Sequence, residues 1–114
     1  MFFAVIAKDH PDCTALRAKT KAHHRAHLDT AAEGLRVLQT GPLLGDGDAE
    51  VGSLLILEAD AIETVEAFVR ADPYVQAGLF AQVEIHPWVW RRGNPYVTDH
   101  TNRNALANTQ EVTR

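Results

Sequence analysis

The sequence predicts a single α+β domain in which two helices pack on one face of an antiparallel sheet. Two observations carry this prediction. Four apolar runs typical of strands and two helical patterns follow one another in the order β-α-β-β-α-β, which is a split βαβ arrangement. The chain has 114 residues, enough for one domain with one hydrophobic core. With both helices on one face, the other face of the sheet has no helical cover.

The N-terminal part of the chain predicts a strand followed by a long helix. Residues Phe2 to Lys8 form a compact apolar run, and the polar segment Asp9-His10-Pro11-Asp12 after it is typical of a turn. A helix is expected from Thr14 to Glu33, and Gly34 marks its end.

The middle of the chain predicts two further strands. The second strand is expected from Leu35 to Thr40, ended by Gly41-Pro42. Residues Leu43 to Gly52 contain three glycines and several acids, which indicates a loop or a hairpin connection. The run from Ser53 to Ala59 is apolar enough to be a central strand.

The second helix has clear signals at both ends. Asp60 is expected to cap it, with Glu63 three residues on as in a capping box. Asp72-Pro73 is expected to end it, because the residue before a proline is disfavoured in the α region. Tyr74 to Gly78 then forms a short turn of helix or a loop. The inward stripe of this helix consists of Ile62, Val65, Phe68 and Val69.

The last strand is expected from Phe80 to Trp90, with alternating faces. Val83, Ile85 and Val89 share one face, while Glu84, His86, Trp88 and Trp90 share the other. Two tryptophans on a face without helices would form a large apolar patch on a monomer. We therefore expect a homodimer, or a higher oligomer, formed through the sheet. Residues 1–95 are predicted to form the domain, and residues 96–114 a polar C-terminal tail.

Composition restricts the classes of function. The net charge of −4 and the lack of a basic block with interleaved aromatic residues argue against nucleic-acid partners and an anionic membrane surface. Cys13 is the single cysteine, which excludes an internal disulfide and a thiolate metal cluster. Met1 leads directly into an apolar run that has no basic region before it and is too short to span a bilayer. We therefore expect a cytoplasmic protein whose partner is a small molecule.

The first helix carries a histidine on its inward side. Arg17 lies on the same side, seven residues before His24, whereas Lys21 and Arg25 lie outside the inward arc. A buried imidazole either has a structural partner or is placed there for chemistry. At about 100° per residue, the following residues fall within one arc of roughly 120°: Leu16, Thr20, His24, His27, Leu28, Ala31 and Leu35.

Several ordered segments together resemble the YciI-like family of YCII-related domains, over roughly residues 2 to 90. They are Leu16-Arg17-x-x-Thr20-Lys21-x-x-His24-x-x-x-Leu28, Thr40-Gly41-Pro42-Leu43-Leu44, Gly52-Ser53-Leu54-Leu55-Ile56, Ala71-Asp72-Pro73-Tyr74 with Ala77-Gly78-Leu79-Phe80, and Val83-Glu84-Ile85-x-Pro87-Trp88. The family usually has Arg where this chain has Lys21. The resemblance implies a ferredoxin-like fold that dimerises through its sheet. It also implies a pocket with a His and an Asp, which fall on His24 and Asp72.

The same resemblance limits the chemistry without naming a substrate. Few members have an established activity. One removes HCl from a chlorinated hydroxyhydroquinone, and the wider fold superfamily includes muconolactone isomerases and small monooxygenases. No cofactor is implied.

Five residues are candidates for the site. His24 is the candidate general base, and Asp72 the carboxylate that orients it. The alternative is that His24 is a satisfied core histidine and Asp72 only caps a turn. Arg17 is either a binder of an anionic substrate group or a surface arginine. Tyr74 and Ser53 are candidates for substrate binding. The alternative for Tyr74 is that it fills the space after Pro73, and no nucleophile elbow surrounds Ser53.

The cluster of histidines on the first helix does not indicate a metal site. His23 and His27 are four residues apart, a spacing that can chelate zinc or nickel, but the further ligands such a site needs are not evident. We interpret His23 as exposed and His27 as packing. The function that we expect is acid–base catalysis by His24 and Asp72, as an elimination or an isomerisation of a small cyclic or aromatic metabolite. The alternatives are a non-catalytic metabolite-binding or accessory dimer, and a cofactor-free small monooxygenase.

Overall fold

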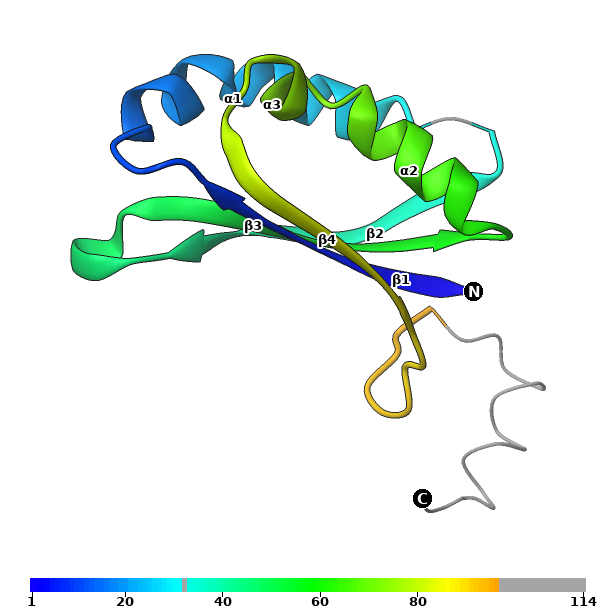
Figure 1. Ribbon diagram of the computed structural model, residues 1–114. Coiled ribbons are helices and arrows are strands. Elements are labelled where there is room, and N and C mark those ends of the chain that lie inside the picture. Colours follow the sequence, from blue (N-terminus) through cyan, green and yellow to red (C-terminus); the bar gives the residue numbers. More distant parts are fainter. Residues whose placement is uncertain (32, 97–114) are drawn as a thin grey trace.

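The computed structural model describes residues 1–31 and 33–96, which form a four-stranded antiparallel sheet with helices on one face (Figure 1). The strands are β1 (Phe2–Asp9), β2 (Leu35–Leu44), β3 (Glu50–Ala59) and β4 (Phe80–Trp88). They lie in the order β2-β3-β1-β4, with every neighbouring pair antiparallel. The predicted α+β class and the β-α-β-β-α-β order are therefore confirmed.

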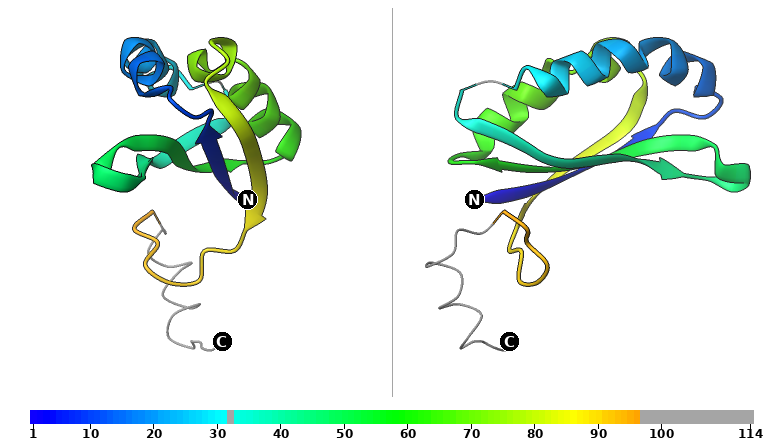
Figure 2. Two further views of the ribbon diagram at one scale, coloured as in Figure 1. Left: turned by 60° about the vertical axis from the view of Figure 1, so that its left-hand side comes forward. Right: turned by 180° about the vertical axis from the view of Figure 1, so that it is seen from behind.

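The helices are α1 (Thr14–Asp29), α2 (Ile62–Arg70) and the short α3 (Pro73–Gln76). All lie on the same face of the sheet, with α1 above the side of β2 and β3 and the other two above the side of β4 (Figure 2). No helix in the described part of the chain is long and apolar enough to cross a membrane. The core between the helices and the sheet consists of Phe3, Val5, Leu35, Leu55, Leu57, Ala59, Val65, Phe68 and Val69.

The first helix is shorter than its pattern predicts, since α1 ends at Asp29 rather than at Glu33. The cause is local. The hydroxyl and the backbone N–H of Thr30 both donate to the carbonyl of Ala26, which closes the last turn. The chain then turns at Gly34, whose φ of +85° is a conformation that glycine adopts readily.

The strands β2 and β3 are longer than predicted and form a hairpin. Instead of ending at Thr40, β2 continues through Gly41 and Pro42, and Pro42 is paired with Ser53 of β3. A proline is tolerated here because β2 is an edge strand whose outer side needs no N–H donor. A 3-10 turn at Asp46–Asp48 connects the two strands, and β3 is central, as expected.

The predicted cap of the second helix is wrong. Ala61, not Asp60, occupies the N-cap position of α2, in extended conformation and without a side-chain cap. Asp60 and Glu63 have the spacing of a capping box, but Asp60 lies one residue before the N-cap position. The inward stripe is confirmed, because Val65, Phe68 and Val69 are buried.

The last strand ends at Trp88 rather than at Trp90, and the chain then folds back on the face of the sheet opposite the helices (Figure 1). The ring of Trp90 packs edge-on against Phe2 at 5.6 Å between centroids and contacts Trp88 at 4.9 Å. The Tyr96 hydroxyl donates to the carbonyl of Leu38 on β2 at 2.7 Å. The chain itself thus covers part of this face, while Trp88 is still 38% exposed. The rest of the predicted tail, residues 97–114, lies outside the described residues.

Candidate active site

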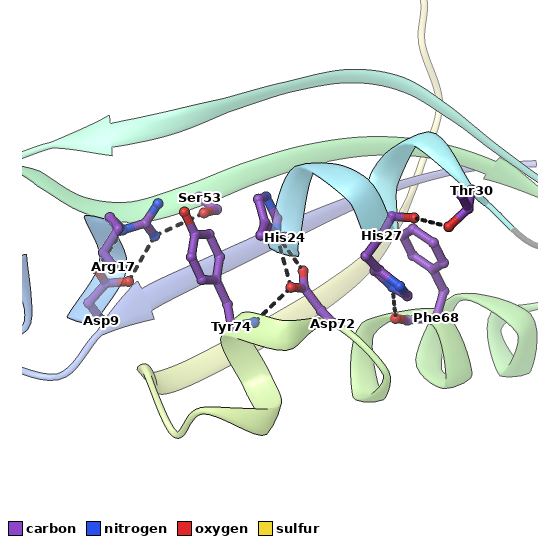
Figure 3. A network of polar contacts seen from close by, with 9 residues as sticks. All are labelled: Asp9, Arg17, His24, His27, Thr30, Ser53, Phe68, Asp72 and Tyr74. Carbon is purple, nitrogen blue, oxygen red and sulfur yellow. Dashed lines mark hydrogen bonds and ion pairs between the residues drawn. The ribbon is translucent and has the colours of Figure 1, made fainter. Parts of the chain in front are cut away.

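His24 and Asp72 are adjacent in the structure, although 48 positions separate them in the sequence (Figure 3). The Nδ1 atom of His24 lies 2.9 Å from both carboxylate oxygens of Asp72. Both side chains are buried, with residue exposures of 7% and 3%. The inward orientation of His24 and its contact with Asp72 therefore agree with the sequence analysis. A carboxylate accepts the Nδ1 proton, and this tautomer leaves Nε2 as the basic nitrogen on the opposite side of the ring.

Asp72 is held in place by the corner between α2 and α3. It is the N-cap of α3, and its Oδ1 accepts a hydrogen bond from the backbone N–H of Tyr74 at 2.9 Å. Pro73 occupies the first helical position, where its missing N–H is not needed. The side chain of Asp72 thus caps this turn and contacts His24 at the same time.

Tyr74 stacks between the guanidinium of Arg17 and the imidazole of His24 (Figure 3). Its ring centroid lies 4.0 Å from that of His24, with 16° between the planes. The Arg17 Cζ lies 4.6 Å from the same centroid on the other side. Burial raises the pKa of the Tyr74 hydroxyl, which the positive charge of Arg17 offsets only in part. The hydroxyl therefore stays protonated near neutral pH and can donate a hydrogen bond.

Arg17 is not a surface residue, because only 3% of it is exposed. Its Nε and Nη2 donate to the two oxygens of Asp9 at 2.7 and 2.9 Å, and Nη2 also donates to the Ser53 hydroxyl at 2.9 Å. Burial by itself would lower the pKa of this guanidinium, but the hydrogen bond and the charge of Asp9 outweigh it, so that the pKa is raised. Arg17 is a permanent cation fixed at the end of β1.

Ser53 reaches Arg17 because Gly52 lets two strands approach closely. A Cβ at Gly52 would collide with the carbonyl oxygen of Ala7 on β1. The glycine thus permits the pairing that places the Ser53 hydroxyl under α1.

These side chains border a cavity of about 170 Å³ between α1 and the β2–β3 hairpin. Arg17, His24, Ser53 and Tyr74 contribute to its wall, whereas Asp72 lies behind His24. An apolar cavity of about 150 Å³ accommodates benzene. The cavity has the size of a single six-membered ring.

Charged residues surround the mouth of the cavity. Lys21 and Arg25 of α1 line it, and Glu50 of β3 lies opposite them. The Lys21 Nζ is 3.0 Å from a carboxylate oxygen of Glu50. This hydrogen bond, together with the charges of Lys21, Arg17 and Arg25, lowers the pKa of Glu50. The mouth therefore combines cations with one ionised carboxylate.

The other histidines of α1 do not join this site. The Nε2 of His27 lies 2.8 Å from the carbonyl oxygen of Phe68, and the two rings stack at 4.3 Å, so His27 is a packing residue, as expected. His23 is exposed. Within residues 1–31 and 33–96, no cluster of three or more potential metal ligands is found.

Sequence reasoning missed four residues at the site: Asp9, Lys21, Arg25 and Glu50. The sequence pattern favours a turn at Asp9, whereas the structure places Asp9 at the end of β1 and pairs it with Arg17. Lys21 and Arg25 fall outside the inward arc, but their long side chains extend over the edge of the helix.

Comparison with known proteins agrees with the fold. The family described as the YCII-related domain matches residues 1–89. Protein YciI from Escherichia coli O6:H1 (strain CFT073) is 31% identical over 94 residues, which cover 77% of this chain and 96% of that protein.

Two solved structures extend the comparison. The 5-chloro-2-hydroxyhydroquinone dehydrochlorinase from Burkholderia phenoliruptrix AC1100, solved in complex with 2,5-dihydroxybenzoquinone, is 34% identical, with a TM-score of 0.71. The similarity covers 78% of this chain and 94% of the dehydrochlorinase. Rv0793 from Mycobacterium tuberculosis has a TM-score of 0.51 at 15% identity, over 82% of this chain and all of that one, and shares the fold alone.

Proposed function

The chain belongs to the family of YCII-related domains, and on this premise we propose that it is a small enzyme acting on a cyclic or aromatic metabolite. One observation carries the proposal: a histidine oriented by a buried carboxylate, 2.9 Å away, lines a cavity the size of one ring. A related structure, 34% identical, is named as a dehydrochlorinase and holds a single-ring quinone.

The proposed chemistry is a proton transfer by His24. With its Nδ1–H donated to Asp72, its Nε2 takes a proton from a carbon or a hydroxyl of the substrate. Asp72 fixes the tautomer and stabilises the imidazolium that forms. The electron pair left on the substrate then either expels a leaving group such as chloride, which is an elimination, or takes the proton back at another carbon, which is an isomerisation.

The neighbouring residues bind and polarise the substrate in this proposal. The Tyr74 hydroxyl, kept protonated by burial, donates a hydrogen bond to a ring oxygen. Arg17 places a positive charge next to the negative charge that develops on that oxygen. The Ser53 hydroxyl holds Arg17 in this position and contributes to the cavity wall.

We also propose that two copies pair through the sheet face opposite the helices. Leu54 and Trp88 are 37% and 38% exposed on strands β3 and β4, and the fold-back of residues 89–96 leaves them accessible. Burial of these side chains against a second copy would stabilise the assembly by the hydrophobic effect.

Turnover of single-ring substrates tests the function. The first probes are 5-chloro-2-hydroxyhydroquinone and its halogenated analogues, with chloride release measured directly. His24→Ala should lower kcat by at least about 100-fold, the usual contribution of a positioned acid–base group. Asp72→Asn should lower kcat less, because the side-chain amide can still contact the imidazole ring of His24. His23→Ala is the matched control, since His23 is exposed one residue away, and should leave kcat unchanged.

The outcome also separates the alternatives. Full turnover by a folded His24→Ala variant would exclude His24 as the base. Ring binding without any turnover would favour a metabolite-binding protein, and turnover that requires oxygen would favour a monooxygenase.

A further inference from the structure

A second hollow continues the ring-sized cavity along the groove between α1 and β2. Its volume is about 360 Å³, roughly twice that of the first, which is about 170 Å³. Arg25, Leu28 and Thr40 line both hollows, so these residues mark the place where one passes into the other. The groove therefore offers more room than a single ring fills.

Arg25 is the third member of a row of cations on α1. Arg17, Lys21 and Arg25 follow one another at intervals of four residues, and successive members are neighbours on a helix surface. Arg17 is paired with Asp9, and Lys21 with Glu50. Among the described residues, no carboxylate lies within 4.0 Å of Arg25 in an ion pair. Its guanidinium thus has donors that are not engaged by an acid of the described chain.

The surroundings of Arg25 favour a single negative charge. Asp29, one turn further along α1, lines the second hollow beyond Arg25 and would repel a dianion placed there about twice as strongly as a carboxylate. An Arg before an Asp at this spacing is also the less favourable orientation for a helical ion pair. The Thr40 hydroxyl, on the opposite wall, can contribute one more hydrogen bond.

We propose that the substrate carries a short arm ending in a carboxylate, which extends from the ring into the second hollow and is bound by Arg25. The inference rests on the proposed function, because it assumes that the ring occupies the cavity at His24. Eight residues of helix separate Arg17 from Arg25, about 12 Å along the axis, so the two cations can hold opposite ends of one ligand. The planar guanidinium matches a carboxylate in two parallel hydrogen bonds.

The experiment compares two ligands that differ only in charge: 2,5-dihydroxyphenylacetate and its neutral amide. Binding is measured by calorimetry under argon, because hydroquinones oxidise in air. The wild-type protein should bind the acid about tenfold more tightly than the amide, the lower end for a charge-assisted contact, because Arg25 is exposed. Arg25→Gln should reduce this ratio to about one. Arg70→Gln, an exposed cation on α2, is the matched control and should keep the ratio.

The outcomes separate the two proposals. Equal affinities for acid and amide in the wild type, a ratio that survives in Arg25→Gln, or binding of neither ligand would overturn the role of Arg25. A tenfold preference that Arg25→Gln abolishes supports it, even if the protein converts neither ligand. If, in addition, none of the chlorinated hydroquinones is turned over, the proposed catalysis fails and the carboxylate site stands. Conversely, turnover of neutral rings without preference for the acid would leave the catalysis in place and remove this inference.

Discussion

Removal of the Asp9 carboxylate should strongly destabilise the fold, because it leaves a buried guanidinium without its counter-ion. The side chains of Asp9 and Arg17 are each 4% exposed, and two hydrogen bonds of 2.7 and 2.9 Å join them. Breaking a buried ion pair by deleting one partner costs about 3–5 kcal/mol. In Asp9→Ala, Arg17 keeps its contacts with Ser53 and Tyr74 and still borders a cavity. We therefore expect a loss of stability at the lower end of this range, about 3 kcal/mol.

Urea and thermal unfolding measure this effect. A loss of about 3 kcal/mol lowers the Tm of a domain of this size by about 12–24 °C. The double variant Asp9→Ala/Arg17→Met should recover part of the loss, because it removes both charges together. Asp60→Ala, an exposed acid that does not cap α2, is the control and should stay within about 0.5 kcal/mol. If Asp9→Ala is no more destabilising than this control, the ion pair does not stabilise the fold as argued.

Three further predictions follow from the same geometry. In a Tyr96→Phe background, the ultraviolet titration of Tyr74 should have its midpoint above pH 10, because burial raises the pKa of its hydroxyl. The stability that this proton contributes is complete below pH 10 and is lost as the pH rises through the pKa of the folded state. A midpoint below pH 10 would contradict the burial of Tyr74. Gly52→Ala should lower the free energy of unfolding in urea by more than about 2 kcal/mol, because the added Cβ would collide with the Ala7 carbonyl. A stability close to that of the wild type would show that β1 and β3 can move apart at no cost. Trp88→Glu should shift the protein from dimer to monomer or cause aggregation in light scattering, whereas a wild-type protein that is already monomeric at micromolar concentration would contradict the proposed dimer.

The sequence was sufficient for the order of the elements and for the contact between His24 and Asp72. Periodicity placed His24 on the inward side of a helix, and the β-α-β-β-α-β order brought the end of the second helix beside it, where Asp72 lies. Both inferences depend on repeating patterns that span many residues. Such patterns average over local irregularities and are therefore reliable guides to which face of an element is buried.

Contacts that depend on the exact path of the backbone could not be predicted from the sequence in the same way. The pairing of Asp9 with Arg17 requires the first helix to cross the end of β1 at a particular height, which no periodicity encodes. The capping-box pattern at Asp60 matched in spacing, yet the chain enters α2 one residue later, at Ala61. End signals of this kind involve one or two hydrogen bonds, and tertiary packing readily shifts them by a residue.

The 48-residue separation of His24 and Asp72 has a consequence for the order of events in folding. Their contact requires α1 and the corner before α3 to lie side by side, since neither segment can bring the two side chains together by local structure. Contacts between segments so distant in sequence depend on closing a long loop, and their formation is slow. Formation of the contact between His24 and Asp72 during refolding should therefore follow the slowest structural phase, and the imidazole would report the completed native state rather than any partly folded form.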